Sequence, residues 1–369
     1  MPRSVFTRIL DALLGEGEFQ ERCDAIKRKG IHPLVRFTAC LRHICYGNAY
    51  DAFDENFRIA ESTLSKSVKS FCILIKKHFG KDFLNRPPTE EEKKRLFEAN
   101  SCRGFPGNFA SWDCKHFVWN QCPQRWAGQF AGHAFGGRKT LILEAIADIK
   151  RYIWYSNFGH AGALNDLNVL DKSSIVGSMI NGTFDISCPE YTINGTKRDW
   201  FYFLADGIYY DWAIFVKTYS DPIDEKQSIF AARQEAVRKD VECAFGMLVA
   251  KFHILANPLR HWYVDDIKNL LDCCIILHNM VVASKGGRDI VLDADDLAIS
   301  QADNNGRWPL FSGTAVSNEV LLADRVDIFS ARSGMFSKKM TSSIEHFKLK
   351  NDLKEHLYKQ YSTSSNSID

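Results

Sequence analysis

Four acidic residues stand in short motifs that are far apart in the sequence. Asp113 lies in SWDCKHF, Asp166 in NDLNVL, Asp206 in YFLADGIYY and Glu242 in RKDVECAFGMLVAKF. Mg²⁺ prefers oxygen ligands such as carboxylates, and two such ions close together can activate water and stabilise the leaving oxygen of an in-line displacement. The motifs are 53, 40 and 36 positions apart (113 to 166, 166 to 206, 206 to 242), so only the fold can bring them together. The four residues therefore suggest a two-metal phosphoryl-transfer site.

Taken singly, each acid has a simpler explanation, because an isolated aspartate at a strand end more often belongs to a turn or a cap. Their joint order is more informative. Asp113 is expected on a first, central strand, Asp206 at the end of a fourth strand, and Glu242 on a helix one turn after Arg238. We predict that Asp113, Asp206 and Glu242 are catalytic and bind metal. Asp166 is expected near a helix start, where it could add a metal ligand or cap backbone N–H groups, and we include it among the metal ligands.

The elements that would position these acids follow from periodicity and composition. The sequence predicts three strands, a helix, a strand and a long helix, at 109–120, 139–149, 151–159, 164–176, 201–205 and 227–252. The second and third strands are expected to form a hairpin. This order is typical of a ribonuclease H-like α/β core, a mixed sheet with helices. Adjacent strands that end at one edge of such a sheet would place Asp113 and Asp206 side by side.

The N-terminal part predicts a small all-helical unit. A helix is expected from about 34 to 46, a short helix over 49–57, a turn at Arg58-Ile59 and a longer helix from Glu61 or Ser62. Two helices joined by a tight turn resemble a helix-turn-helix, whose second helix can enter a major groove. The longer helix has a local excess of positive charge that suits phosphates, so we predict DNA binding by Lys66, Lys69, Lys76 and Lys77. The alternative is a solvated basic face.

Basic residues also lie near the predicted strands. Lys115 and His116 follow the first aspartate and could touch DNA phosphates, or could only fill opposite faces of the sheet. A Gly-rich segment lacks the spacing of a nucleotide-binding loop, but its cations could line DNA: Arg125, His133, Arg138 and Lys139. We place Lys115 and Arg138 in the predicted DNA-binding set.

Composition sets the class of protein. The chain has 369 residues, 45% apolar and 25% charged, with a net charge of +2, so a nucleic-acid surface must come from local clustering. Its 11 cysteines form no regular framework, which favours reduced thiols in the cytosol or nucleus. Met1–Gln20 lacks the apolar stretch of a signal peptide. No run reaches the roughly 18 apolar residues of a membrane span, so no membrane partner is expected.

Breaks in composition divide the chain into four parts. Residues 1–85 form the predicted helical, DNA-binding region, and residues 86–106 form a linker with a connecting helix whose cap is Thr89. Residues 107–285 hold the predicted core with the four acids and end in a packed helix over 265–285. Residues 286–369 form a C-terminal extension, of which 286–344 are weakly patterned and the tail at 362–369 is expected to be disordered.

Several of these segments together resemble Harbinger-type DDE transposases, and most closely the plant transposon protein branch. The matching words are GNFASWDCKHFVWNQCP, RWAGQFAGH, LEAIADIKRYIWYSNFGHAGALNDLNVLDKSS, YFLADGIYY, RKDVECAFGMLVAKFHIL and CCIILHNMV, and the segment from HPLVRF to SKSVKSF resembles the family's N-terminal region. The resemblance covers roughly residues 30–285. One departure is Cys114-Lys115, where many relatives carry Gly-Thr after the first aspartate; the carboxylate is unaffected.

The resemblance implies a ribonuclease H-like nuclease domain that uses two divalent ions, Mg²⁺ or Mn²⁺, with all four acidic positions filled. It implies a nuclear DNA transposase: water held by a metal between Asp113 and Asp206 attacks a phosphodiester at the element's end, and the freed 3′-hydroxyl attacks target DNA. Its partners would be DNA (element ends and target) and often a Myb/SANT-like helper that assists nuclear entry from the cytoplasm; a homo-oligomer is left open. The alternative is a domesticated, transposase-derived DNA- or chromatin-binding protein without transposition activity.

Overall fold

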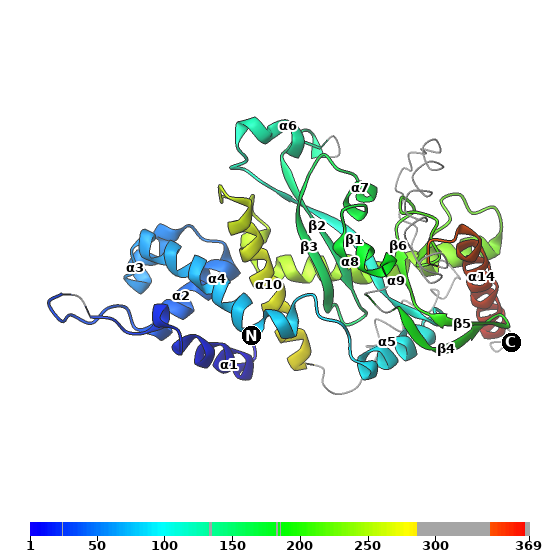
Figure 1. Cartoon of the computed structure of the whole chain (residues 1–369), viewed down its shortest axis with the longest axis horizontal. Coiled ribbons are helices and arrows are strands. Elements are labelled where there is room, and N and C mark those ends of the chain that lie inside the picture. The colour runs from blue at the N-terminus through cyan, green and yellow to red at the C-terminus, as the bar shows by residue number, and fades with distance from the viewer. Residues whose placement is uncertain (24, 133–134, 182–183, 185, 286–339, 366–369) are drawn as a thin grey trace.

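The computed structural model describes residues 1–369 apart from 24, 133–134, 182–183, 185, 286–339 and 366–369. The described residues form a mixed α/β structure, with a five-stranded mixed sheet, a two-stranded sheet and many helices. In Figure 1 the N-terminal helices lie at one end of an elongated molecule, the large sheet lies in the middle, and α14 (Ser343–Ser365) lies at the other end.

The N-terminal helices are α1 (Arg3–Leu14), α2 (Pro33–Tyr46), α3 (Asp54–Phe57) and α4 (Glu61–Phe83). α2 ends at Gly47, whose left-handed conformation (φ 66°) is the usual glycine C-cap. Arg58 is also left-handed (φ 52°) and makes the turn between α3 and α4. The predicted short helix, turn and longer helix are therefore confirmed.

The connecting helix α5 (Glu90–Cys102) begins with a capping box. The Thr89 hydroxyl accepts a hydrogen bond from the Glu92 backbone N–H (3.3 Å), and the Glu92 carboxylate accepts one from the Thr89 N–H (2.9 Å). Two N–H groups at the helix start are thereby satisfied. The predicted cap at Thr89 and the helix after it are confirmed.

The large sheet has the strand order β3-β2-β1-β6-β7. Its strands are β1 (Asn108–Val118), β2 (Thr140–Ala147), β3 (Ile153–Ala161), β6 (Tyr202–Ala205) and β7 (Phe215–Lys217). β1, β2 and β3 are antiparallel neighbours, whereas β6 runs parallel to β1 and β7 parallel to β6. The four predicted strands and the hairpin are confirmed. β7 and the separate hairpin of β4 (Ser187–Ile193) and β5 (Thr196–Trp200) were not predicted.

The segment after β3 differs from the prediction of one helix over 164–176. It forms two short helices, α7 (Asp166–Leu170) and α8 (Ser174–Ile180). Ser173 adopts an extended conformation at the start of α8, and the Tyr155 hydroxyl lies 3.0 Å from the Ser174 hydroxyl. The helical pattern is therefore interrupted at Ser173.

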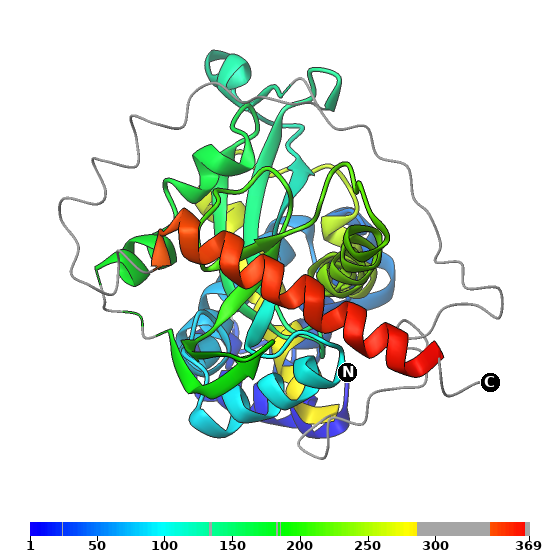
Figure 2. The same cartoon turned by 90° about the vertical axis from the view of Figure 1, so that its right-hand side faces the viewer.

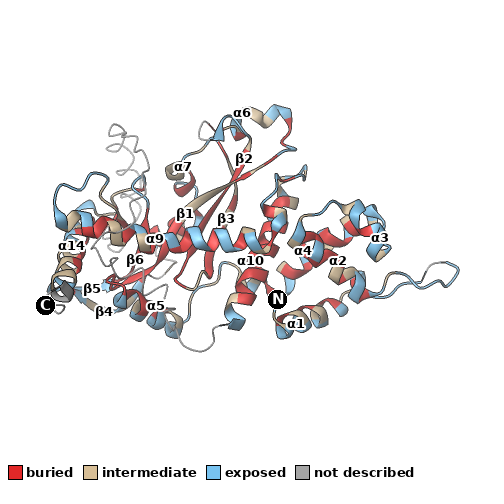
Figure 3. Ribbon diagram, turned by 180° about the vertical axis from the view of Figure 1, so that it is seen from behind, coloured by how far each residue is buried: buried red, intermediate tan, exposed pale blue. Residues whose placement is uncertain are grey.

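The two long helices predicted at 227–252 and 265–285 are confirmed as α9 (Glu225–Lys251) and α10 (Val264–Lys285). α9 packs along β1, β2 and β6, and α10 packs between α4 and β3. α10 is long and apolar enough to cross a membrane, but 72% of its apolar window is buried within the protein, and Figure 3 shows it largely in the colour of buried residues. It is therefore a core helix.

The two faces of the large sheet carry two apolar clusters, because side chains alternate along each strand. On β2, Leu141, Leu143 and Ala145 belong to a cluster that continues into α10, the second half of α9 and the N-terminal helices. Ile146 and the β1 residue Trp112 belong to the other cluster, with β6, β7 and α14. The N-terminal helices thus share a core with one face of the sheet.

The C-terminal extension contains a helix, α14, that the sequence analysis did not assign. Its buried residues Leu349, Leu353 and Leu357 recur every four positions and join the second cluster. Figure 2 shows α14 lying across the end of the molecule, next to α9 and the sheet. The helix continues to Ser365, inside the tail predicted to be disordered. The rest of that tail, and most of 286–344, lies outside the described residues.

Candidate active site

The site begins where β6 ends and β1 continues. The last paired residues of these two parallel strands are Ser111 and Leu204. Asp113 follows two positions later on β1, and Asp206 comes directly after β6. Asp206 is exposed, and its Oδ1 accepts a hydrogen bond from the Gly207 N–H (2.7 Å). The two aspartates thus lie at the same edge of the sheet.

Asp113 is largely enclosed. It is paired with Ala145 across the sheet, so its side chain shares the face that α9 covers. Burial, with smaller contributions from the charges of Asp166 and Glu242, raises the pKa of Asp113 to about 7, although Arg238 and the Cys114 backbone N–H oppose the rise. The cause is desolvation of the charged form, so a nearby cation stabilises the ionised carboxylate of Asp113.

Arg238 is that cation in the structure. It lies one helical turn before Glu242 on α9, and its guanidinium reaches Asp113 Oδ2 at 3.4 Å and Glu242 Oε1 at 2.9 Å. The guanidinium therefore bridges the strand-borne aspartate and the helix-borne glutamate. Its own side chain is largely buried, so solvent screens these pairs only in part.

Asp166 joins the group from α7, and it is not the cap of that helix. The Asn165 side chain accepts the hydrogen bond from the Asn168 N–H (2.8 Å) and so takes the capping role. Burial raises the pKa of Asp166; a hydrogen bond from the Cys114 side chain lowers it, and the charge of Asp206 raises it. Asp166 therefore interacts electrostatically with both Asp113 and Asp206.

The donor chemistry of the four acids suits Mg²⁺ or Mn²⁺, because all four offer carboxylate oxygens. Their positions do not form a complete metal site. Within the residues that the structure describes, no three His, Cys, Asp or Glu side chains are grouped so that they could hold a metal ion, and Arg238 occupies the space between Asp113 and Glu242. The chain thus brings the four acids to one region, with a guanidinium between two of them.

Sequence reasoning missed two buried groups on the opposite face of β1. Glu144 on β2 is fully buried, and it accepts hydrogen bonds from Trp112 Nε1 (3.2 Å) and Asn157 Nδ2 (3.4 Å). Burial raises its pKa to about 7 against those hydrogen bonds, and the charge of Asp166 adds to the rise. The Tyr209 hydroxyl lies 3.7 Å from Cys114 Sγ. A single glutamate inside the apolar run LILEAIA was the available signal for Glu144.

Most of the α4 lysines that were predicted to bind DNA are paired with carboxylates, so they do not form a free basic face. Three of them form ion pairs: Lys69 with Asp266 (2.8 Å), Lys76 with Asp272 (2.7 Å) and Lys77 with Glu16 (2.7 Å). Asp266 and Asp272 belong to α10, against which α4 packs. Lys66 is exposed. A DNA phosphate would have to replace three existing carboxylate partners on this helix.

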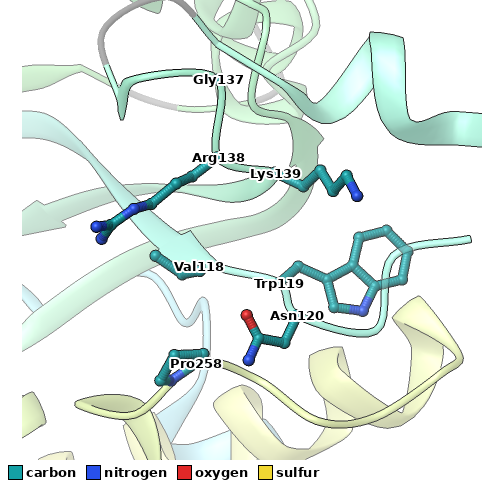
Figure 4. Close-up of a pocket in the computed structure, with 7 residues that line it drawn as sticks. All are labelled: Val118, Trp119, Asn120, Gly137, Arg138, Lys139 and Pro258. Carbon is teal, nitrogen blue, oxygen red and sulfur yellow. The ribbon is translucent and has the colours of Figure 1, made fainter. Parts of the chain in front are cut away.

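The two remaining cations of the predicted DNA-binding set lie along the hairpin of β1 and β2. The Lys115 ammonium lies about 6 Å from the rings of Phe117 and Phe245, beneath α9. Arg138 is exposed and lines a hollow of about 330 Å³ beyond the end of β1 (Figure 4). Of the other candidate cations, Lys139 lines the same hollow, Arg125 stacks on Trp126, and His133 lies outside the described residues.

Comparison with known protein families identifies a related family. A family model described as plant transposon protein matches residues 81–289, which is more than half of the chain. The matched range contains the large sheet, α9, α10 and all four acids. No curated protein and no solved structure gives a significant match.

Proposed function

Because the chain belongs to the plant transposon protein family, we propose that it is a DNA transposase or transposase-derived endonuclease of the Harbinger-type DDE group. Its core would be ribonuclease H-like, an assignment supported by three antiparallel strands followed by two parallel ones in the order β3-β2-β1-β6-β7. The observation that carries the proposal is that Asp113, Asp166, Asp206 and Glu242, from four separate elements, lie in one region and influence one another's charge.

In the proposed reaction, water hydrolyses a phosphodiester at the element's end and leaves a 3′-hydroxyl. That hydroxyl then attacks a phosphodiester of target DNA, forming one new P–O bond and releasing the target's own 3′-oxygen. When bound, Mg²⁺ or Mn²⁺ would supply Lewis-acid stabilisation of the phosphate charge. The four carboxylates would hold the ions, and the rigid sheet edge would hold the carboxylates in place.

Arg238 would have a part in this reaction as a residue of the chain. It neutralises Asp113 and Glu242 while they have no other cation, and it could turn to a DNA phosphate when they acquire one. The proposed setting is nuclear, with element ends and target DNA as substrates. A Myb/SANT-like helper and self-association belong to the same proposal.

The test is strand cleavage of a supercoiled plasmid carrying the repeats that flank the coding sequence, with and without Mn²⁺. Asp113→Asn, Asp206→Asn and Glu242→Gln should each abolish nicking while the protein stays folded. Glu98→Gln, an exposed acid on α5, is the matched control and should cleave normally. Full cleavage by any of the three variants would remove that residue from the site, and metal-independent cleavage would contradict the proposal.

One observation favours a second candidate, a DNA-binding protein that keeps the fold without cleaving. It is the bridge of Arg238 between Asp113 and Glu242, together with the lack of a three-acid group among the described residues. Calorimetric titration with Mn²⁺ separates the two functions. A nuclease should bind Mn²⁺, and Asp113→Asn should weaken that binding. A protein that only binds DNA should show the same DNA affinity with Mn²⁺ or with EDTA.

A further inference from the structure

The end of the molecule beyond β1 combines positive charge with exposed aromatic rings. Two stretches that contain no Asp or Glu, residues 114–143 and 243–264, contribute to it from the ends of β1, β2 and α9, although the chain contains 45 acids in 369 residues. At that average, these 52 residues (30 and 22) would hold about six acids, so they form a local region of positive potential. We call this surface the acid-free end.

The two stretches are held together by specific contacts. The Leu259 N–H donates to the Val118 carbonyl (2.8 Å), and the Asn120 N–H donates to the Leu259 carbonyl (3.0 Å). Trp119 Nε1 donates to the His261 carbonyl (2.8 Å). The loop before α10 is thus fixed along the end of β1, next to Pro258 and the hollow shown in Figure 4.

The loop presents groups that suit a nucleic-acid strand. Arg260 is exposed, and the next exposed side chains are Trp262 (54%) and Tyr263 (65%). Arg138 and Lys139 lie across the hollow from Pro258 (Figure 4). Cations bind phosphates, and exposed aromatic rings stack on bases whose faces are free. The first acids beyond the loop are Asp265 and Asp266, and Asp266 is paired with Lys69.

We propose that the acid-free end binds an unpaired strand of DNA that flanks the cleavage point, with Arg138 and Arg260 on its phosphates and Trp262 and Tyr263 against its bases. The idea rests on the proposed function for the identity of the ligand. β1 links this surface to the active site: the six residue steps from Asp113 to Trp119 span about 20 Å. That distance corresponds to roughly six stacked nucleotides.

Unpaired DNA fits this surface better than duplex, because stacking needs a base face that the double helix hides. A protein partner such as the helper would also use Trp262 and Tyr263, but it would not account for the absence of acids over 52 residues. Charge and aromatic exposure together therefore favour a single strand that leaves the duplex near the cleavage point.

Fluorescence anisotropy of the full chain in EDTA tests this without any cleavage. Two labelled probes are compared, a blunt duplex of about 20 base pairs and the same duplex with an unpaired arm of roughly ten nucleotides. Wild-type protein should prefer the armed probe. Trp262→Ala with Tyr263→Ala should weaken binding of the armed probe by about fivefold or more and leave the blunt probe unaffected.

Arg138→Gln with Arg260→Gln should weaken binding of both probes and reduce the salt dependence, by a slope of about 1.5 for two lost phosphate contacts. Phe347→Ala, an exposed aromatic on α14, and Lys94→Gln, an exposed cation on α5, are matched controls that should bind like wild type. Melting curves confirm folding, and all these side chains are exposed.

An equal preference for the armed probe in wild type and in the Trp262→Ala, Tyr263→Ala protein would overturn the inference. A wild-type protein that binds both probes equally well would also overturn it. If the Trp262→Ala, Tyr263→Ala protein then lost only self-association or helper binding, the surface would be a protein interface. A different variant tests the proposed nuclease activity apart from this inference. Asp113→Asn should stop cleavage but keep the preference for the armed probe. A protein that never cleaves yet keeps that preference would retain the inference alone.

Discussion

At the scale of single residues, the site is defined by how each carboxylate is neutralised. Asp113 and Glu242 share Arg238, whereas Asp166 interacts with Cys114 and with Asp206. Two acids that face each other in a largely enclosed place repel unless a cation lies between them. The arginine therefore stabilises the arrangement and also competes with any metal ion for the same oxygens.

This competition predicts the behaviour of Arg238→Gln. Without metal, the variant should lose about 1–3 kcal/mol of unfolding free energy, because a hydrogen bond to Asp113 and an ion pair with Glu242 disappear. Its affinity for Mn²⁺ should rise by roughly tenfold, since no guanidinium has to be displaced. Calorimetric titration and metal-free melting curves measure the two effects, and Arg95→Gln, which removes a surface pair with Glu91, is the control. Weaker Mn²⁺ binding in Arg238→Gln would show that the arginine supports the metal site instead.

Asp166 allows a second prediction at this scale, because the sequence left open whether it caps a helix. Asn165 is the cap, so Asp166→Asn should not lower the melting temperature. Burial raises the pKa of Asp166, and the neutral amide should keep or increase the stability of the metal-free protein. Cleavage should require more Mn²⁺. A wild-type Mn²⁺ response together with a lower melting temperature would exclude the ligand role, and Asn165→Ala provides the comparison for true loss of the cap, about 0.5–2 kcal/mol.

At the scale of elements, the sheet positions the acids and α10 positions the sheet. The fully buried Asn279 accepts a hydrogen bond from the Ile153 N–H (3.0 Å) and donates to the Ile153 and Phe83 carbonyls (2.8 Å each). His278 beside it donates from Nε2 to the Arg151 carbonyl (2.7 Å) and accepts from Lys251 at Nδ1 (3.2 Å). α10 thus holds the start of β3, which pairs with β2 and through it with β1.

His278 makes this contact sensitive to acid. Burial, together with the Lys251 charge, lowers the pKa of His278 to about 4, although the hydrogen bond to the Arg151 backbone opposes this. An unfolded histidine titrates near 6.5, so the stability that the neutral ring contributes is present above about pH 6.5 and is lost as the pH falls through about 4. The unfolding free energy should decline over this window, and less steeply in His278→Gln. Equal slopes for both proteins in denaturant titrations at several pH values would contradict the assignment.

Most elements follow from local pattern, and the exceptions have local causes. The sequence predicted three strands, β1, β2 and β3, because their side chains alternate in polarity or are apolar throughout. It predicted three helices, α5, α9 and α10, because their starts and lengths are clear. β7 has only three residues, too few for a periodic signal. The β4–β5 hairpin did carry one, since its turn is Asn194-Gly195, both with positive φ, a recognised hairpin signal. The prediction of a single helix over 164–176 was wrong because the backbone is extended at Ser173, a break that periodicity does not register.

At the scale of the whole molecule, the sequence could identify the four acids but not their neighbours. Arg238 was visible one turn before Glu242, yet its reach to Asp113 depends on how α9 crosses β1. The packing of α4 on α10 was equally hidden, because it joins residues almost 200 positions apart: Lys69 with Asp266 and Lys76 with Asp272. Because these acidic partners are so distant in the sequence, the lysines of α4 were interpreted as a free basic face.

The last prediction separates DNA binding from packing on α4. Lys76 pairs with Asp272, whose side chain is only 8% exposed, so Lys76→Gln should lower the unfolding free energy by about 1–2 kcal/mol by leaving that acid without its partner. Lys66 is exposed on the same helix, and Lys66→Gln should leave the melting curve unchanged. If α4 binds DNA in the full chain, Lys66→Gln should weaken binding and lower its salt dependence by a slope of nearly one.

The two lysines are matched controls for each other, because they differ in partner and not in helix or charge. Wild-type DNA affinity in Lys66→Gln, combined with a destabilised Lys76→Gln, would assign the basic charge of α4 to its contact with α10. DNA recognition would then rest with the acid-free end, where the cations face no acid in either contributing stretch of the sequence.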